Sequence, residues 1–280
     1  MSAPAPGSGS AVLLPGLAHL LRPLVRLLLR RGITLPMLHD LLRELYVDVA
    51  RRDVLRDRRA QTDSRISLLT GIHRKELRRQ RTADATAPPE PPGLSLSSQI
   101  VARWLGGPRW GGADGAPLPL PRGAPTGEAS FDALVAAVTR DLRPRAVLDE
   151  WLSEGVVRMD VQDRVVLNDA AYLPRPGSAE QLHYFARNLH DHIAAAAANV
   201  LAEGRPRFLD RSVHYDALTA AQAARLAAFA HAGAQRLLLE VNRAALAMLD
   251  DAPPAPPPTR RVNLGVFLYT EDDPPPGAAP

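Results

Sequence analysis

The stretch TDSRISLLTGIHRKELRRQR, residues 62–81, decides the fold of the N-terminal part of the chain, because it predicts two short helices joined at one glycine. Asp63 or Ser64 can cap the first helix, since a short side-chain oxygen accepts hydrogen bonds from the N–H groups of the first turn. Gly71 lies where the chain must turn sharply, and glycine takes a positive φ there without steric cost. The pattern is that of a helix-turn-helix.

Each of these two predicted helices has an apolar face and a polar face. Ile66, Leu68 and Leu69 form the apolar face of the first helix, and Ile72 and Leu77 form that of the second. The polar face of the second helix is basic, and basic side chains can donate hydrogen bonds to phosphates or to the major-groove edge of guanine. The candidate DNA contacts are His73, Arg74, Lys75, Arg78, Arg79, Arg65 and Arg81.

Three residues match the twenty-residue helix-turn-helix pattern. Gly71 takes the turn, Ser67 is the small residue four positions before it, and Leu77 is the apolar residue six positions after it. One residue departs from the pattern, because Gln80 occupies a late apolar position. We therefore expect the second helix either to end early or to continue as a basic arm.

Charge is divided unevenly along the chain. Residues 1–82 contain 16 Lys and Arg against 7 Asp and Glu, a net charge of +9, and residues 83–280 carry −5, which gives the total of +4. A cluster of basic residues in one part of a chain indicates a surface for a polyanion. Duplex DNA is the expected partner of residues 62–81. A solvated helix face without a partner, or binding of RNA or of an acidic protein, are the alternatives.

Two amphipathic helices precede the helix-turn-helix. Leucines at three- and four-residue spacing predict one helix over 16–31, and Pro36 starts another over about 36–52. The inward residues of the second helix are expected to be Leu38, Leu41, Leu42, Leu45 and Val49. We expect residues 13–81 to form one DNA-binding domain, preceded by a disordered tail at 1–12.

The first of these helices has an alternative interpretation as a membrane-surface helix. Two arginines and two prolines interrupt its apolar run, at Arg22, Arg26, Pro15 and Pro23, and no positively charged region precedes it. We therefore expect a core helix of the first domain, with neither a signal peptide nor a membrane span.

The runs LLRPLVRLLLRRGITLPMLHDLLRELYVDVA and TDSRISLLTGIHRKELRR resemble a bacterial family known only as a domain of unknown function. Its typical segment is SR-x-x-LLTG-hydrophobic-HRK-E, which falls here on residues 64–76, and the resemblance extends more loosely over most of the chain. The resemblance implies a helix-turn-helix-like head and a bacterial source. It implies no catalytic residues.

A proline-rich linker at 82–96 separates the head from a second predicted domain at 97–175. This domain begins with a helix at 97–105 and a long loop that includes Trp110, for which we favour local packing over docking of a partner. Two further helices follow, opened by Ser130 and Pro144, and then two alternating strands. The order of two helices and a hairpin is that of a winged helix. The second of these helices carries both acidic and basic residues. Its charges therefore favour DNA binding less than the basic residues of the first domain do.

The region 178–270 is predicted to contain two long helices and two strands, before a disordered tail at 271–280. The helices span 178–203 and about 220–250, and the strands lie near 207–215 and 262–269. Since two helices packed as a hairpin cannot bury all their apolar surface, either the other domains or a second copy of the chain must cover it, and we expect this region to form a homodimer. The whole chain is therefore expected to be mainly α with minor β.

Neither a metal site nor a known catalytic motif is apparent. His183, His190 and His192 flank Asp191, but residues two apart on a helix point roughly 200° away from each other, which favours ordinary surface histidines. The chain has no cysteine, so disulfides, thiolate metal sites and a cysteine nucleophile are excluded, and a cytoplasmic location is expected. Phosphate-binding loops, nucleophile elbows and zinc-protease helices do not occur. We expect no cofactor and no enzyme activity.

The sequence thus predicts a transcriptional regulator that binds duplex DNA through residues 73–81. The alternative is a protein-interaction adaptor built from winged-helix domains without DNA binding, which the acidic region 83–280 favours. The sequence does not indicate the operator, the effector, or whether the protein activates or represses transcription.

Overall fold

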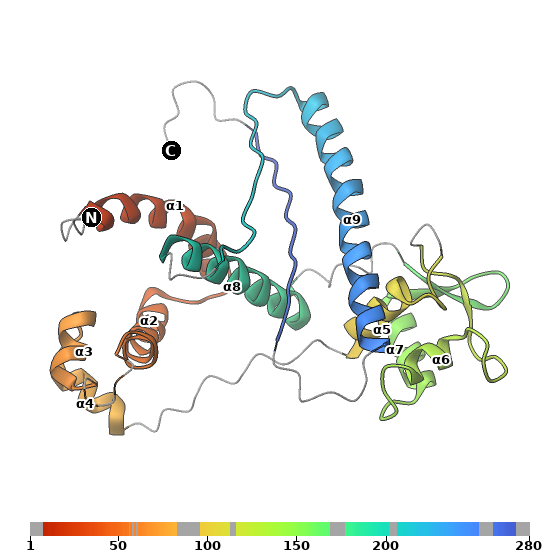
Figure 1. The fold of residues 1–280 in the computed structure, drawn as a ribbon, viewed down its shortest axis with the longest axis horizontal. Coiled ribbons are helices and arrows are strands. Elements are labelled where there is room, and N and C mark those ends of the chain that lie inside the picture. The colour runs from red at the N-terminus through yellow and green to blue at the C-terminus, as the bar shows by residue number, and fades with distance from the viewer. Residues whose placement is uncertain are drawn as a thin grey trace. The chain divides into compact units, whose positions relative to one another are not determined.

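The fold is mainly helical with one small antiparallel sheet, as predicted (Figure 1). The computed structural model describes residues 8–55, 57, 59, 61–82, 96–112, 116–168, 177–201, 206–251 and 260–272; the side chains of 8–10 and 80–82 lie outside this description. Most of the linker expected at 82–96 and of the expected tails also lies outside it. The chain divides into two compact units, residues 1–89 and 90–280.

The first unit consists of helices in the order that the sequence predicts. They are α1 (Ser8–Arg30), α2 (Leu35–Val49) with the π-helical turn η1 (Ala50–Val54), α3 (Asp63–Thr70) and α4 (Arg74–Thr82). Helix α1 begins eight positions before the expected residue 16, and so includes residues 8–12 of the expected tail. Gly32, with a φ of 72°, follows the end of α1.

The core of the first unit is small and joins α2, η1, α3 and α4. Val47, Ala50, Ile66 and Leu77 are buried, and Leu55 and Ile72 pack against them. Ala50 is 4% exposed, so the π-helical turn η1 contributes its small side chain to this core. This core contains both apolar residues that were expected to hold α4.

Part of the predicted burial in this unit is wrong. The leucine face of α2 was expected to point inward, but α2 packs through Val47, and only Leu38 of the expected face is half-buried. The exposed members of the expected faces of α2 and α3 are Leu41, Leu42, Leu45, Val49, Leu68 and Leu69. Helix α3 has only eight residues, so it presents a single buried side chain, Ile66, to its neighbours.

Leu77→Ala should destabilise the first unit by about 2–5 kcal/mol, because it leaves a cavity in a core of few residues. Leu68→Ala is the matched control, since Leu68 is 85% exposed and Leu77 is 0% exposed. Hydrogen exchange measured on the peptides of α3 and α4 checks this. Tryptophan fluorescence should not change in either variant, because all three tryptophans lie in the second unit.

The second unit begins with three helices and three strands. In chain order these are α5 (Leu96–Gly106), β1 (Leu120–Pro121), α6 (Phe131–Ala136), α7 (Pro144–Glu154), β2 (Val157–Met159) and β3 (Arg164–Leu167). The strands form an antiparallel sheet in the order β1-β3-β2. The three helices and the β2–β3 hairpin were predicted. Strand β1 was not, because it lies in a proline-rich loop and has only two residues.

The core of this part of the chain is built around three aromatic rings. Phe131 lies between Trp104 and Trp151 in edge-to-face contacts, with ring centroids 6.0 Å and 5.7 Å away. Both indole N–H groups donate hydrogen bonds, from Trp104 to the carbonyl of Leu118 and from Trp151 to Ser97 Oγ. Trp110 is 5% exposed, so it is a packing residue as expected.

The C-terminal region differs from the predicted helical hairpin. It contains α8 (Ala179–Leu201) and α9 (Ala220–Asp250), and α9 packs against α5 rather than along α8. Gly106 of α5 is in close contact with Asn242 of α9, and Asn242 Nδ2 donates to the carbonyl of Ala102. A glycine in α5 and a polar residue in α9 therefore select a pairing that apolar periodicity alone does not indicate.

The two strands predicted near 207–215 and 262–269 are also not formed. Residues 206–218 and 260–272 are extended, but within the described residues neither segment pairs with a strand. Both lie against α8 through side-chain contacts, and α8 and α9 contain no buried residue. Within the described residues, many apolar side chains of α8, α9 and the two extended segments are therefore exposed.

Candidate nucleic-acid interface

The turn between α3 and α4 has the geometry that the sequence predicts. Gly71 has a φ of 71° and ends α3, and its N–H donates to the carbonyl of Ser67 at 2.9 Å. The Thr70 hydroxyl donates to the carbonyl of Ile66 at 2.7 Å and accepts from the N–H of Ile72 at 3.2 Å. The direction in which α4 leaves the turn is therefore fixed by hydrogen bonds as well as by the glycine.

The capping residue of α3 differs from the predicted one. Thr62, and not Asp63 or Ser64, has extended backbone angles, and its Oγ1 accepts from the N–H of Arg65 at 3.3 Å. Asp63 is the first helical residue, where a carboxylate still interacts favourably with the N-terminal end of the helix dipole. The prediction missed the cap by one residue.

His73 stands immediately before α4 and caps it. Its carbonyl accepts from the N–H groups of Glu76 and Leu77, and its Nδ1 accepts from the N–H of Lys75 at 3.3 Å. Nδ1 of His73 is thus engaged by the backbone, while Nε2 of the exposed ring remains available to a ligand. His73 therefore combines a structural role with a position at the exposed start of α4.

The exposed side of α4 is a continuous basic surface. Leu77 is buried, and with roughly 100° per residue Lys75 and Arg79 point about 160° away from it. Arg78 and Arg74 lie on one flank of the helix, about 100° and 60° from Leu77 by the same spacing, and both are exposed. Among the described ion pairs, none includes Arg74, Lys75 or Arg78. We call these four side chains, Arg74, Lys75, Arg78 and Arg79, the basic face.

A carboxylate that sequence reasoning did not single out holds this face in place. Glu76 Oε1 lies 3.4 Å from Arg43 Nη1 of α2 and 2.7 Å from Arg79 Nη2 of α4. Arg43 also pairs with Asp40 at 3.0 Å. The Glu76 side chain is 27% exposed, so these contacts are partly shielded from water. The three-residue spacing of Glu76 and Arg79 is visible in the sequence, but the contact with Arg43 is not.

The other two predicted DNA contacts are Arg65 and Arg81. Arg65 is separate from the basic face, and the side chain of Arg81 lies outside the described residues. Arg65 is exposed in the first turn of α3. Arg81 lies in α4, and its side chain is outside the described residues, as is that of Gln80. Helix α4 continues to Thr82, so it does not end before Gln80.

Helix α7 of the second unit provides a contrast. Its exposed side carries Arg145 together with Asp149, Glu150 and Glu154, and Arg145 Nε lies 3.9 Å from Asp149 Oδ2. Acidic side chains are interspersed with the basic ones, so the field of α7 is weak compared with that of α4.

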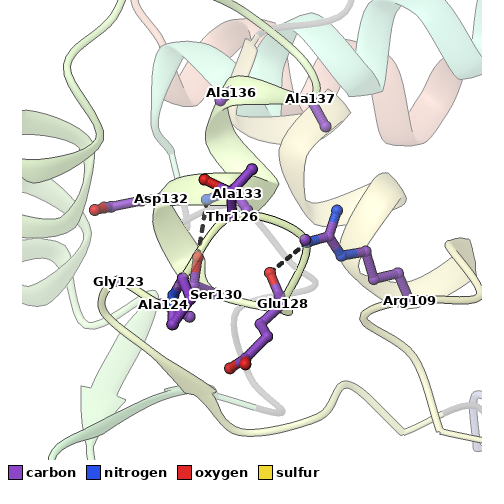
Figure 2. Close-up of a pocket in the computed structure, with 12 residues that line it drawn as sticks. Arg109, Gly123, Ala124, Thr126, Glu128, Ser130, Asp132, Ala133, Ala136 and Ala137 are labelled. Atoms are coloured by element: carbon purple, nitrogen blue, oxygen red, sulfur yellow. Dashed lines mark hydrogen bonds between the residues drawn. The ribbon is translucent and has the colours of Figure 1, made fainter.

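A shallow pocket of about 490 Å³ lies beside α6 (Figure 2). Arg109 donates to the carbonyl oxygen of Glu128, and Ser130 Oγ accepts from the N–H of Ala133 as the cap of α6. These polar groups hold the loop and the helix end. Among the described residues that line the pocket, no acid and base are paired for catalysis.

Two further features of the described residues bear on other kinds of site. No group of three His, Asp or Glu residues there could hold a metal ion. In α1, residues 11–30 have the length and apolar composition of a membrane span, as core helices of soluble proteins and signal sequences also do. None of these residues is buried among the described residues, so the expected core helix does not pack into the first unit there.

Residues 12–277 match the model of a family described as a family of unknown function, DUF6502. The protein belongs to the DUF6502 family. No curated protein and no solved structure matches the chain. The predicted resemblance to an uncharacterised family is thus confirmed, and the basic face of this DUF6502 protein has to be interpreted from its own geometry.

Gly71→Ala should destabilise the turn by about 1–2 kcal/mol, because a residue with a Cβ is strained at a φ of 71°. No atom lies within 4 Å of the added Cβ, so the cost comes from the backbone alone. Gly71→Asn is the matched variant and should cost less, because asparagine tolerates this conformation better. Hydrogen exchange of α3 and α4 distinguishes the two variants, and equal protection in both would contradict the explanation.

Proposed function

We propose that this DUF6502 protein is a DNA-binding transcriptional regulator that contacts duplex DNA through the basic face of α4. The observation that carries the proposal is the exposure of Arg74, Lys75 and Arg78 on a helix held from behind by Leu77 and Glu76. Arginine and lysine neutralise phosphates, which provides affinity independent of sequence. His73 and Arg74 lie at the start of α4, where a recognition helix contacts base edges. The proposed function places the protein in the cytoplasm.

The geometry around α3 and α4 supports this proposal in a second way. Two short helices joined at Gly71 resemble the arrangement in which the second helix enters the major groove and the first crosses the backbone. Arg65 is exposed near the start of α3 and is suited to a phosphate contact. The net charge of +9 in residues 1–82 favours association of this unit with a polyanion.

We also propose that residues 96–168 form a winged-helix domain. The element order α5, β1, α6, α7, β2, β3 and the sheet order β1-β3-β2 support it, with the β2–β3 hairpin as the wing. The mixed charges of α7 favour a protein contact for this domain.

Replacing Arg74 and Lys75 together by alanine should weaken binding to duplex DNA at least roughly ten-fold, because two charge-assisted contacts are lost. The slope of log K against log salt should become shallower by about 1.8, at roughly 0.9 for each phosphate contact. Fluorescence anisotropy with a random duplex at several salt concentrations measures both quantities.

The matched control is the double variant Arg143→Ala and Arg145→Ala at the start of α7, which removes the same charge from another exposed helix. We expect its affinity and salt slope to stay close to those of the unmodified protein. If the α4 variant bound like the unmodified protein at every salt concentration, the assignment of the interface to α4 would be wrong.

A second candidate function is a protein-interaction adaptor. The net charge of −5 in residues 83–280 and the many exposed apolar side chains of α8 and α9 favour it. Gel-shift titration of the whole protein with random duplex at low salt separates the two functions. No shift at any protein concentration would favour the adaptor.

A further inference from the structure

Helix α1 presents a wide apolar surface that the core of the first unit does not use. None of the residues that form or line this core belongs to α1. All side chains of residues 11–20 are exposed, and Leu14 is 63% and Leu20 53% exposed. In the second half of the helix Leu24 and Leu28 are half-buried, whereas Leu29 is 67% exposed. The leucines of α1 are therefore accessible to a partner over most of the helix.

The charged and apolar side chains of α1 lie on opposite sides of the helix. With roughly 100° for each residue, all three arginines of the helix and its histidine fall within about 80° of its circumference, which we call the basic arc. All the leucines of the helix fall within about 200° on the other side, which we call the apolar arc. The basic arc consists of His19, Arg22, Arg26 and Arg30, and the apolar arc contains Leu13, Leu14, Leu17, Leu20, Leu21, Leu24, Leu27, Leu28 and Leu29.

The polar side of α1 has only one sign of charge. Residues 1–39 contain no aspartate and no glutamate, and Arg31 follows directly after the helix. A helix with a broad apolar face and a basic polar face is suited to the interface of a bilayer, where the apolar side chains enter the acyl region. Basic side chains at that depth are attracted to anionic headgroups, and in α1 no carboxylate opposes this attraction.

We infer that α1 is an interfacial helix that binds the surface of an anionic lipid bilayer through its apolar arc, with the basic arc at the headgroups. The helix would lie parallel to the bilayer plane, with Leu17 pointing into the acyl chains and His19 pointing away from them. The interpretation of α1 as a membrane-surface helix is favoured over a core helix because its leucines are exposed. The inference does not depend on DNA binding.

The distribution of charge makes a membrane span a poorer interpretation of α1. A spanning orientation would place Arg22 and Arg26 in the hydrocarbon, where an arginine is costly. Pro23 also removes the helical hydrogen-bond donor of the His19 carbonyl, and a carbonyl without a donor is costly in lipid. In the interfacial orientation both arginines and this carbonyl lie on the water side.

The width of the apolar arc makes a second copy of α1 a poorer partner. Two helices that pair as a coiled coil cover a narrow apolar seam, and this seam is narrower than the apolar face of an ordinary core helix. An arc of about 200° would leave leucines exposed on both sides of such a seam. A bilayer surface covers the whole arc.

Replacing Leu13 and Leu17 together by glutamate should weaken binding to anionic vesicles at least roughly ten-fold, because two carboxylates would enter the acyl region. Co-sedimentation of the full-length protein with vesicles of phosphatidylcholine and roughly one-third phosphatidylglycerol measures this. The first unit should stay folded, because residues 11–20 are exposed and its core contains no residue of α1. The variant should also keep its affinity for duplex DNA, so a failure here is distinct from a failure of the proposed function.

The matched control is the double variant Leu68→Glu and Leu69→Glu, which makes the same charge change at exposed leucines of α3. We expect it to bind vesicles like the unmodified protein. Because both double variants keep the basic face of α4, vesicle binding through α4 would survive in both of them. That outcome, or an unmodified protein that does not bind the vesicles, would overturn the inference.

Replacing Arg22 and Arg26 together by glutamine tests the role of the headgroup charge. The affinity for the anionic vesicles should fall roughly thirty-fold, on the order of five-fold for each arginine. Vesicles of phosphatidylcholine alone are the control, and there the variant should bind as weakly as the unmodified protein. An equal loss on both kinds of vesicle would contradict a contact with anionic headgroups.

The absence of cysteine from the chain allows a single environment-sensitive label to report the orientation of α1. A nitrobenzoxadiazole label on Leu17→Cys lies near the middle of the apolar arc, and one on His19→Cys lies roughly 200° away. Anionic vesicles should shift the emission to shorter wavelength at position 17 and much less at position 19. Equal shifts at both positions would indicate a membrane span. A shift at position 17 that depends on protein concentration and not on vesicles would indicate a second copy. Either result would overturn the inference.

Discussion

Burial of Leu77 is the interaction on which the geometry of the first unit depends. This side chain packs with Ile66, Val47 and Ala50, and so joins α4 to α3, α2 and η1 in a core of only four buried residues. Because one side of α4 is held in this way, the rest of the helix faces solvent, and Lys75 and Arg79 lie opposite Leu77 with Arg74 and Arg78 on one flank. A small core therefore determines which way the basic face of α4 points. Gly71 sets the angle at which α4 leaves the turn.

The elements defined by local patterns could be predicted from the sequence, and those defined by distant contacts could not. Helix boundaries followed from caps and glycines, as at Ser130, which caps α6, and Gly71, which ends α3. The basic face of α4 also follows from periodicity alone. By contrast, the contact of Glu76 with Arg43 joins residues 33 positions apart, and no local pattern encodes it.

The errors have a common physical origin. Apolar periodicity identifies a stripe on a helix but not the surface that covers it, so the leucine face of α2 was expected to be buried and α9 was expected to pack along α8. Helix α9 packs on α5 because Gly106 allows close approach and Asn242 donates to the carbonyl of Ala102, and neither feature belongs to an apolar stripe. The alternation in residues 206–218 and 260–272 correctly predicted an extended backbone, but not its lack of a strand partner in the chain.

The contact between Glu76 and Arg79 has a consequence for selectivity. The Arg79 guanidinium already has a carboxylate 2.7 Å away, so a phosphate at this position would replace an ion pair instead of water. The free energy gained from Arg79 would thus be smaller than that from Arg74 or Lys75, for which no such exchange occurs. Glu76 would compete with a phosphate for Arg79. This competition would lower the affinity for an isolated phosphate more than the affinity for a ligand that also contacts the start of α4. One acidic residue in a basic helix can thereby reduce indiscriminate binding without removing any positive charge.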